Sequence, residues 1–158
     1  MLNQKDYYSS PGSIISVFFL WGFIAASNGI FIPFCKDFFG LDQFESQLID
    51  FAFYGAYYFG GLLVFLISSF IGKDIINNWG YKNTIIYGLI LSTLGATMMI
   101  KTIDYQSFEI ILISLFIVGL GFSIQQTSAN PFIINLGSPK TGAHRLNLAG
   151  AVNNIGSI

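Results

Sequence analysis

The feature that most constrains the fold of this chain is a series of apolar segments long enough to cross a membrane. They lie near residues 13–35, 46–71, 83–101 and 108–136, and a fifth apolar segment occupies 145–158. A helix needs about 20 apolar residues to cross the hydrocarbon core of a bilayer. The sequence therefore predicts an all-α membrane protein with four full transmembrane helices and a truncated fifth.

The balance of charged and apolar residues supports the same class. Charged residues make up 9% of the chain and hydrophobic residues 53%, whereas soluble domains carry about 25% charged residues. The seven basic residues are scattered, so the chain lacks the dense positive surface that binding a polyanion needs. The lipid bilayer is therefore the expected partner, and nucleic acid is excluded. Cys35 is the single cysteine, which rules out an internal disulfide.

Residues 1–12 are interpreted as a cytoplasmic tail. They carry both an acid and a base, and the apolar stretch after them is too long for the core of a signal peptide. Basic residues are more frequent on the cytoplasmic side of a membrane protein, which places the amino terminus in the cytoplasm. The basic residues on that side are Lys5, Lys73, Lys82, Lys140 and Arg145, and those on the opposite side are Lys36 and Lys101.

Polar amides and hydroxyls concentrate in residues 121–158, although this segment begins inside an apolar stretch. Ser123, Gln126 and Asn130 recur at steps of three and four, so they share one face of a helix. Burying an unpaired amide costs about 2 to 7 kcal/mol, and lipid tails offer it no partner. We therefore expect a polar cavity between helices. Its candidate lining residues are Gln126, Asn130 and Asn153, with Asn28 and Asn154 in support.

Three polar residues have alternative interpretations. Asn28, well inside the first helix, either lines the cavity or makes a structural bond to another helix. Asp50 lies about two turns into the second helix and is a candidate site for a coupling proton or cation. The alternative for Asp50 is an exposed acid that complements the helix dipole near the outer surface. His144 is placed in a loop, where a structural role is favoured over proton transfer.

Local patterns predict how two helices start and bend. Asp42 followed by Glu45 resembles a capping box, so the second helix should start near Asp42. Pro131 lacks a backbone N–H, so the fourth helix should bend there. Gly119 and Gly121 lack the third glycine and the preceding strand of a nucleotide-binding loop, and they indicate close helix packing instead.

The chemistry of the candidate cavity suits a neutral, hydroxyl-rich ligand. Uncharged amides donate and accept hydrogen bonds at once, as the hydroxyls of a sugar require. The sequence offers no acid pair, no buried histidine and no group of metal ligands. It therefore does not predict an enzyme, a metal site or a cofactor site.

Four segments carry motifs of a known family. They are FFLWGF with IPF in the first helix, QLIDFAFYGAYYFG in the second, GYK before the third, and TSANPF followed by HRLNLAGAVNNIG. These motifs resemble the fucose:proton symporter family of the major facilitator superfamily, which includes glucose and galactose transporters. The resemblance implies that 13–158 form an incomplete N-terminal six-helix half, with the C-terminal half of the protein missing. It also implies sugar uptake across a bacterial cytoplasmic membrane by alternating access of two halves.

The same resemblance assigns expectations to single residues. The family's proton-coupling acid falls on Gly29, and an acid that helps to bind sugar falls on Gln126. Asn153 matches the asparagine that faces the family's sugar site. The resemblance therefore implies a hexose or deoxyhexose site in which both carboxylates are absent. For a coupled proton or sodium ion, Asp50 is the remaining candidate.

A rival interpretation is a non-transporting membrane protein. Four helices and part of a fifth cannot alternate access around a central site on their own. The chain would then be a truncated or degenerate fragment, or the partner of a missing half, and its polar cluster would only hold helices together. Further spans in the downstream reading frame would favour the transporter.

Overall fold

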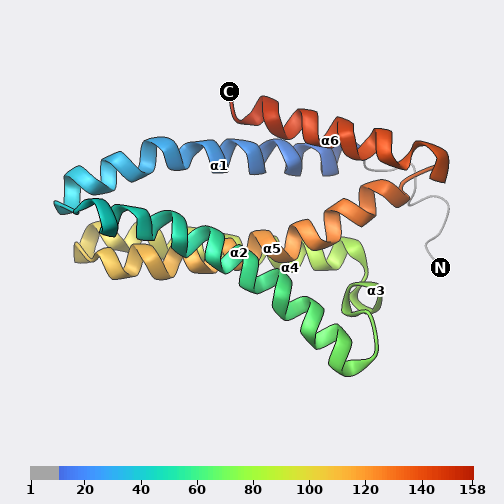
Figure 1. Cartoon of the computed structure of the whole chain (residues 1–158), viewed down its shortest axis with the longest axis horizontal. Coiled ribbons are helices and arrows are strands. Elements are labelled where there is room, and N and C mark those ends of the chain that lie inside the picture. Colours follow the sequence, from blue (N-terminus) through green and yellow to red (C-terminus); the bar gives the residue numbers. More distant parts are fainter. Residues whose placement is uncertain (1–10) are drawn as a thin grey trace. The chain divides into compact units, whose positions relative to one another are not determined.

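The computed structural model describes residues 11–158, and all its long elements are helices (Figure 1). The elements are α1 (Pro11–Phe39), α2 (Gln43–Ile71), α3 (Ile75–Trp79), α4 (Tyr81–Tyr105), α5 (Phe108–Asn135), the 3-10 turn η2 (Pro139–Thr141) and α6 (Gly142–Gly156). None of the described residues forms a strand. The prediction of an all-α fold is confirmed.

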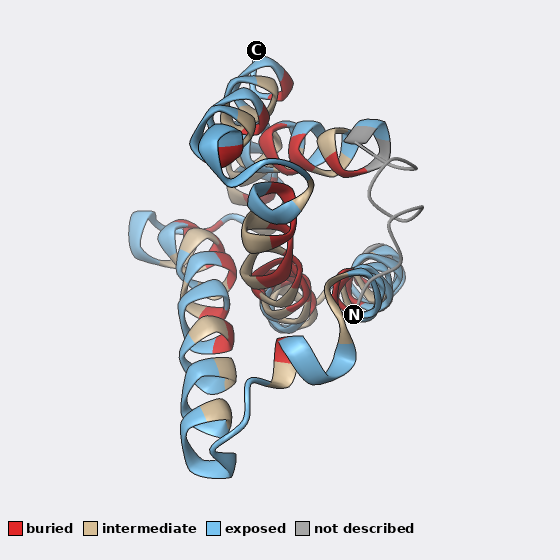
Figure 2. Cartoon of the chain, turned by 90° about the vertical axis from the view of Figure 1, so that its right-hand side faces the viewer, coloured by how far each residue is buried: buried red, intermediate tan, exposed pale blue. Residues whose placement is uncertain are grey.

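Four of these helices are long and apolar enough to span a membrane. The spans are Ile14–Phe39, Gln43–Ile71, Tyr81–Thr102 and Phe108–Asn135. Many apolar side chains on them are exposed, and the exposed helix faces are pale blue in Figure 2. Phe70, for example, is 87% exposed. A membrane protein tolerates such faces because lipid tails are as apolar as the side chains that meet them.

The first helix is longer than the sequence predicts at both ends. α1 begins at Pro11 and runs to Phe39, instead of covering 13–35. Pro33 lies inside it, and the helix stops before Gly40, whose φ of 66° is left-handed. Of the predicted tail, only 11–12 are described, and they belong to the first turn of α1. The rest of that prediction lies outside the described residues.

The capping box predicted for the second helix is confirmed. The backbone N–H of Glu45 donates to Asp42 Oδ1 at 2.7 Å, and the N–H of Asp42 donates to Glu45 Oε2 at 2.9 Å. These bonds satisfy N–H groups that the first turn of a helix leaves open. α2 begins at Gln43, directly after Asp42 as the capping box predicts, and three residues before the apolar segment that starts near residue 46.

The later helices also differ at their ends from the predicted ranges. α4 extends beyond 83–101 in both directions, whereas α5 runs through Pro131 to Asn135 and agrees with the predicted 108–136 to within one residue. The bend predicted at Pro131 stays a prediction. α6 starts at Gly142, which corrects the placement of His144 from a loop to the first turn of a helix. The short elements α3 and η2 were not predicted, because a single turn is too brief to show helical periodicity.

The chain divides into two compact units, which we describe separately. The first unit contains 11–30 and Ala129–Ile158, and the second unit contains Phe31–Ser128. The chain passes between them once inside α1 and once inside α5. The second unit has an apolar cluster of buried residues made by Cys35, Leu41, Ile49, Ile111 and Leu115.

Close helix packing at two glycines of α5 is confirmed within the second unit. A Cβ at Gly119 would lie 3.0 Å from Ala56 Cβ in α2. A Cβ at Gly121 would lie 2.6 Å from the carbonyl oxygen of Gly88 in α4. Side chains would not fit at these distances, so both glycines allow neighbouring backbones to approach α5 closely.

Candidate functional site

The six residues predicted for the site divide between the two units. Asn130, Asn153, Asn28 and Asn154 belong to the first unit, and Gln126 and Asp50 belong to the second unit. Each residue is therefore described with the neighbours of its own unit.

Asn153 joins α6 to α1 in the first unit. Its Nδ2 donates to the carbonyl oxygen of Phe18 at 2.9 Å. The helices touch here, because a Cβ at Gly22 would overlap the carbonyl oxygen of Asn153 and a Cβ at Gly156 would overlap that of Phe19. The amide nitrogen of Asn153 thus holds two helices together, while its Oδ1 accepts no hydrogen bond from a described residue.

Asn28 carries a buried amide nitrogen without a partner. Nδ2 of Asn28 is shielded from solvent and makes no hydrogen bond with the described residues. Its neighbour Ser27 is satisfied locally, since Oγ donates to the carbonyl oxygen of Phe23 at 2.7 Å. A buried donor without an acceptor costs about 1 to 3 kcal/mol. The structural-bond alternative for Asn28 needs an acceptor for Nδ2, and the described residues provide none.

Asn130 and Asn154 differ in exposure. Asn130 is half-buried near the end of α5, and its side chain makes no hydrogen bond with a described residue. Asn154 is exposed on α6, and its carbonyl oxygen accepts from Ser157 Oγ at 2.8 Å. Within this unit Asn130 therefore has an unbonded amide that is partly shielded from solvent, whereas the side chain of Asn154 is exposed.

Gln125 and Gln126 are adjacent on α5 but have different neighbours in the second unit. Gln125 is 1% exposed, and its Nε2 donates to Ser92 Oγ of α4 at 2.9 Å and to the carbonyl oxygen of Gly121 at 3.2 Å. Gln126 is half-buried, and its side chain makes no hydrogen bond with a described residue. The sequence placed both glutamines in one polar cluster. Gly88 and Ser92, one helical turn apart on α4, are the sequence signal for a close contact with α5. Gln125, and not Gln126, lies in that contact.

Asp50 lies in the second turn of α2 and is half-buried. Its carboxylate has no ion pair or hydrogen bond with any described residue. Both interpretations of Asp50, a coupling-ion site and an acid near the helix start, are compatible with this position. The first requires access to the ion, and the second requires only solvent or headgroups nearby.

Arg145 has a structural role that sequence reasoning missed. Its Nε donates to the carbonyl oxygen of Ile133 at 2.9 Å, its Nη1 to Thr141 Oγ1 at 2.7 Å, and its Nη2 to the carbonyl oxygens of Ser138 at 3.2 Å and of Ile134. The last carbonyls of a helix have no partner within it and carry partial negative charge. The guanidinium on α6 therefore caps the end of α5 within the first unit.

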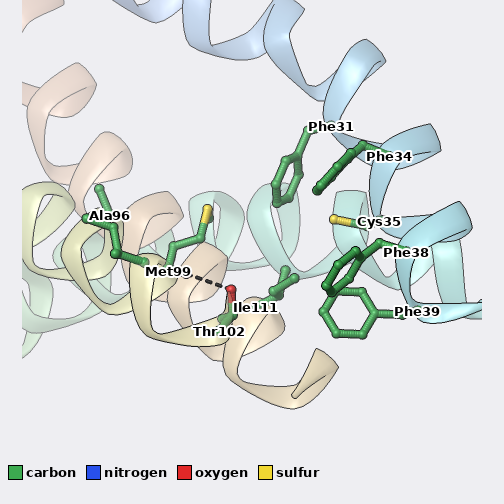
Figure 3. A pocket seen from close by; sticks show the side chains of 10 residues that line it. Phe31, Phe34, Cys35, Phe38, Phe39, Ala96, Met99, Thr102 and Ile111 are labelled. Carbon is green, nitrogen blue, oxygen red and sulfur yellow. Dashed lines mark hydrogen bonds between the residues drawn. The ribbon is translucent and has the colours of Figure 1, made fainter. Parts of the chain in front are cut away.

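Two cavities in the second unit are apolar and do not suit a sugar. One, of about 330 Å³, lies between the last turns of α1 and residues of α4 and α5 (Figure 3). The part of α1 that lines it contributes Phe31, Phe34, Cys35, Phe38 and Phe39. Its hydroxyl, Thr102 Oγ1, already donates to the carbonyl oxygen of Met99 at 2.6 Å. The other, of about 250 Å³, contains Thr84 and Thr127. Their hydroxyls donate to the carbonyl oxygens of Gly80 and Ser123, four residues earlier in the chain. Neither cavity offers free groups for several sugar hydroxyls.

Comparison with known proteins identifies the family. Residues 2–158 match the sequence profile of the Major Facilitator Superfamily. The chain is 37% identical over 155 residues to a Brucella abortus protein named glucose/galactose transporter, covering 98% of this chain and 36% of that protein. It is 34% identical over 156 residues to the L-fucose-proton symporter of Escherichia coli, covering 98% of this chain and 34% of the symporter.

A solved structure shows the same fold. The crystal structure of the transporter FucP in the outward conformation matches with a TM-score of 0.76 and 32% identity, over 96% of this chain and 34% of that chain. This chain therefore spans about a third of the length of the relatives it matches. The profile match over residues 2–158 and the four membrane spans show that the chain is a multi-pass membrane protein that belongs to the Major Facilitator Superfamily.

Proposed function

We propose that this chain forms part of a secondary transporter that carries a neutral sugar, a hexose or deoxyhexose, across the bacterial cytoplasmic membrane by alternating access. Relatives named for glucose, galactose and fucose support the substrate class. The scattered basic residues support an amino terminus in the cytoplasm. The proposed transporter also needs a C-terminal half. In the relatives, that half lies in the part of their chains beyond the matched third.

One observation about the residues carries this proposal. Asn28 Nδ2 is buried in a membrane-spanning helix without an acceptor among the described residues. Lipid cannot supply that acceptor, whereas a sugar hydroxyl can. A bound sugar would satisfy the donor and relieve its desolvation cost.

The roles of the site residues follow from their free amide atoms. Asn153 keeps its Oδ1 available because Nδ2 is held by Phe18, so Asn153 accepts from a sugar hydroxyl. Gln126 and Asn130 each offer a donor and an acceptor to the sugar. Asn28 and Asn154 support the site. The absence of charge on these side chains favours a neutral substrate over an anionic or cationic one.

Uptake of labelled hexoses and deoxyhexoses tests the substrate class in cells that express the gene in its native reading frame. Gln126→Ala and Asn130→Ala are expected to lower uptake about tenfold at low sugar concentration, because each removes a hydrogen-bonding group. Asn78→Ala is the matched control, since Asn78 is an exposed amide in α3, outside the four spans. The proposal would be contradicted if cells with the parent protein accumulated none of the labelled sugars. Equal uptake by Gln126→Ala and Asn78→Ala would also contradict it.

For ion coupling we propose Asp50 as the site that binds a proton or sodium. Its position inside a membrane-spanning helix without a cationic partner among the described residues supports this role. Asp50→Asn keeps the size of the side chain and removes its charge, so uptake should lose its dependence on the ion gradient. Uptake by Asp50→Asn that keeps its full dependence on the ion gradient that drives the parent protein would exclude Asp50.

A further inference from the structure

The contact between α4 and α5 in the second unit is a continuous seam of small residues and one amide. We call the α4–α5 seam the set formed by Gly88, Ser92 and Gly95 of α4 with Ser114, Val118, Gly121 and Gln125 of α5. A Cβ at Gly88 would lie 2.6 Å from Gln125 Cγ, and one at Gly95 would lie 2.8 Å from the carbonyl oxygen of Ser114. No side chain fits on these glycines, so the two backbones are in contact along the seam.

Hydrogen bonds cross the seam in both directions. Gln125 Nε2 of α5 donates to Ser92 Oγ of α4 at 2.9 Å, and Ser92 Oγ donates to the carbonyl oxygen of Val118 of α5 at 3.4 Å. Gln125 Nε2 also donates to the carbonyl oxygen of Gly121 in its own helix at 3.2 Å. The side chain of Gln125 therefore lies between the two helices and is bonded to both, which opposes rotation of α5 about its axis.

The rotation of α5 decides what the next residue contacts. Successive residues of an α-helix project about 100° apart. With Gln125 inside the seam, Gln126 lies beyond its edge, half-buried and without a hydrogen bond to a described residue. A rotation of α5 by a fraction of that angle would move Gln126 toward lipid or toward the seam, where its amide would be desolvated or paired.

We propose that Gln125 is a positioning residue whose hydrogen bond to Ser92 sets the rotation of α5 and keeps the Gln126 amide available to the transported sugar. The role of Gln126 rests on the proposed function, whereas the effect of Gln125 on its orientation does not. Ser92 is the partner through which Gln125 acts, and the glycines of the seam bring the two side chains within reach.

Thiol labelling measures the orientation without any sugar. Cys35→Ala removes the single cysteine, and Gln126→Cys then reports how accessible position 126 is to a hydrophilic thiol reagent in membranes. Ser92→Ala and Gln125→Leu are expected to change the labelling rate about fivefold, the effect of losing one net hydrogen bond. Asp104→Cys, at an exposed residue near the end of α4, checks insertion and reagent quality in each background.

The chain offers a matched control for the loss of a hydroxyl. Ser114 lies in the same seam, is fully buried, and its Oγ has no hydrogen-bond partner. Ser114→Ala makes the same chemical change as Ser92→Ala without breaking a bond across the seam. The labelling rate at position 126 should stay within about twofold in Ser114→Ala. Equal labelling rates in Ser92→Ala, Gln125→Leu and Ser114→Ala would overturn the proposal.

A double variant separates positioning from stability. Replacing both partners of a buried hydrogen bond by apolar groups is often nearly neutral for stability. Ser92→Ala with Gln125→Leu should therefore melt close to the parent protein and still show the altered labelling rate. Recovery of both the melting temperature and the parental labelling rate would mean that the pair only stabilises the fold, and would overturn the positioning role.

Sugar uptake with Gln126 intact provides the second measurement. Ser92→Ala and Gln125→Leu should raise KM about fivefold with a smaller change in maximal rate, because they displace a group that contacts sugar. An unchanged KM beside an altered labelling rate would overturn the link between Gln125 and the sugar. If the parent protein takes up no sugar while labelling depends on Ser92 and Gln125, the proposed function fails and the positioning of residue 126 stands.

Discussion

The α4–α5 seam and the contact of α1 with α6 are both helix contacts made through glycines and an amide side chain. They differ in how far that amide is buried and in whether its oxygen is available. Each lies within one unit, closes on glycines, and is crossed by one amide that donates from its nitrogen. In the seam, Gln125 is 1% exposed and lies between the helices. In the α1–α6 contact, Asn153 is only half-buried and its Oδ1 accepts no bond from a described residue.

This difference separates a packing role from a binding role. A buried amide that lies within a helix contact stabilises the contact and has little left to offer a ligand. An amide that is anchored by one atom presents its other atom in a defined direction, because the anchor limits its rotamers. Polarity inside a membrane span is therefore not enough to assign a residue to a site. The hydrogen-bond partners of each of its polar atoms decide whether it packs helices together or can bind a ligand.

The largest expected effect comes from adding a methyl group at the glycines of the two contacts. Gly121→Ala and Gly22→Ala should each lower the free energy of unfolding by about 1 to 3 kcal/mol, because the new Cβ overlaps the backbone of the facing helix. Gly55→Ala and Gly150→Ala are controls, since a Cβ there meets nothing closer than 3.9 Å. Unfolding in detergent micelles measures all four. Equal costs at contact and control positions would refute the close approach.

The next effect concerns Arg145, which ties α6 to the end of α5 as Asn153 ties it to α1. Arg145→Met keeps most of the side chain but removes its donors to the end of α5, and should cost about 2 kcal/mol, as expected for bonds from a charged group. Lys140→Met is the matched control, because Lys140 is exposed in η2. Unfolding in micelles and proteolysis between α5 and α6 would both report the loss. A cost no larger than that of Lys140→Met would show that the cap contributes nothing.

The comparison of the two amides is tested by removing each of them. Gln125→Leu and Asn153→Leu each break one bond between membrane helices, and each should lower the free energy of unfolding by about 1 kcal/mol. Their effects on function should differ: Asn153→Leu should abolish high-affinity sugar uptake, whereas Gln125→Leu should only weaken it. Measured KM values for one hexose decide. Equal losses of sugar affinity would remove the distinction between packing and binding amides.

The smallest effect is expected at a local feature that crosses no helix contact. Asp42→Ala removes the capping box at the start of α2 and should cost about 0.5 to 1 kcal/mol. Asp37→Ala, at an exposed acid near the end of α1, should cost less, because that carboxylate caps no helix start. Thermal unfolding compares the two. A larger cost for Asp37→Ala would show that the box contributes less than general charge near this loop.

The sequence predicted well those features that depend on neighbouring residues. The capping box needs only Asp42 and Glu45 three residues apart, and the number of membrane spans needs only long apolar runs. Helix ends were predicted less well, since α1 runs past the predicted end at residue 35 to Phe39 and stops before Gly40. The apolar run ends at Lys36, whereas the helix continues to the residue before the left-handed backbone of Gly40.

The assignment of polar residues was the least predictable part. The sequence placed Gln125 and Gln126 in one cluster and gave the site to Gln126, and the structure shows that Gln125 is buried against Ser92. It gave Asn153 a binding role without showing that its nitrogen is bonded to Phe18. Arg145 was counted only as a cytoplasmic charge, although its guanidinium caps α5. Each partner lies on another helix or beyond a turn, at a position that helical spacing alone does not reveal.

By itself, the sequence determined that this protein is helical, crosses the membrane several times and carries uncharged amides where lipid would not tolerate them. Only the tertiary structure decided which amides hold helices together and which keep a free atom. The physical reason is that lipid is as apolar as a packed helix face, so hydrophobic periodicity does not tell which face of a membrane helix is buried. Gln125 and Gln126 project about 100° apart on α5, and their residue types do not show which of them faces α4. The close approach of Gly88 to Gln125 shows that it is Gln125.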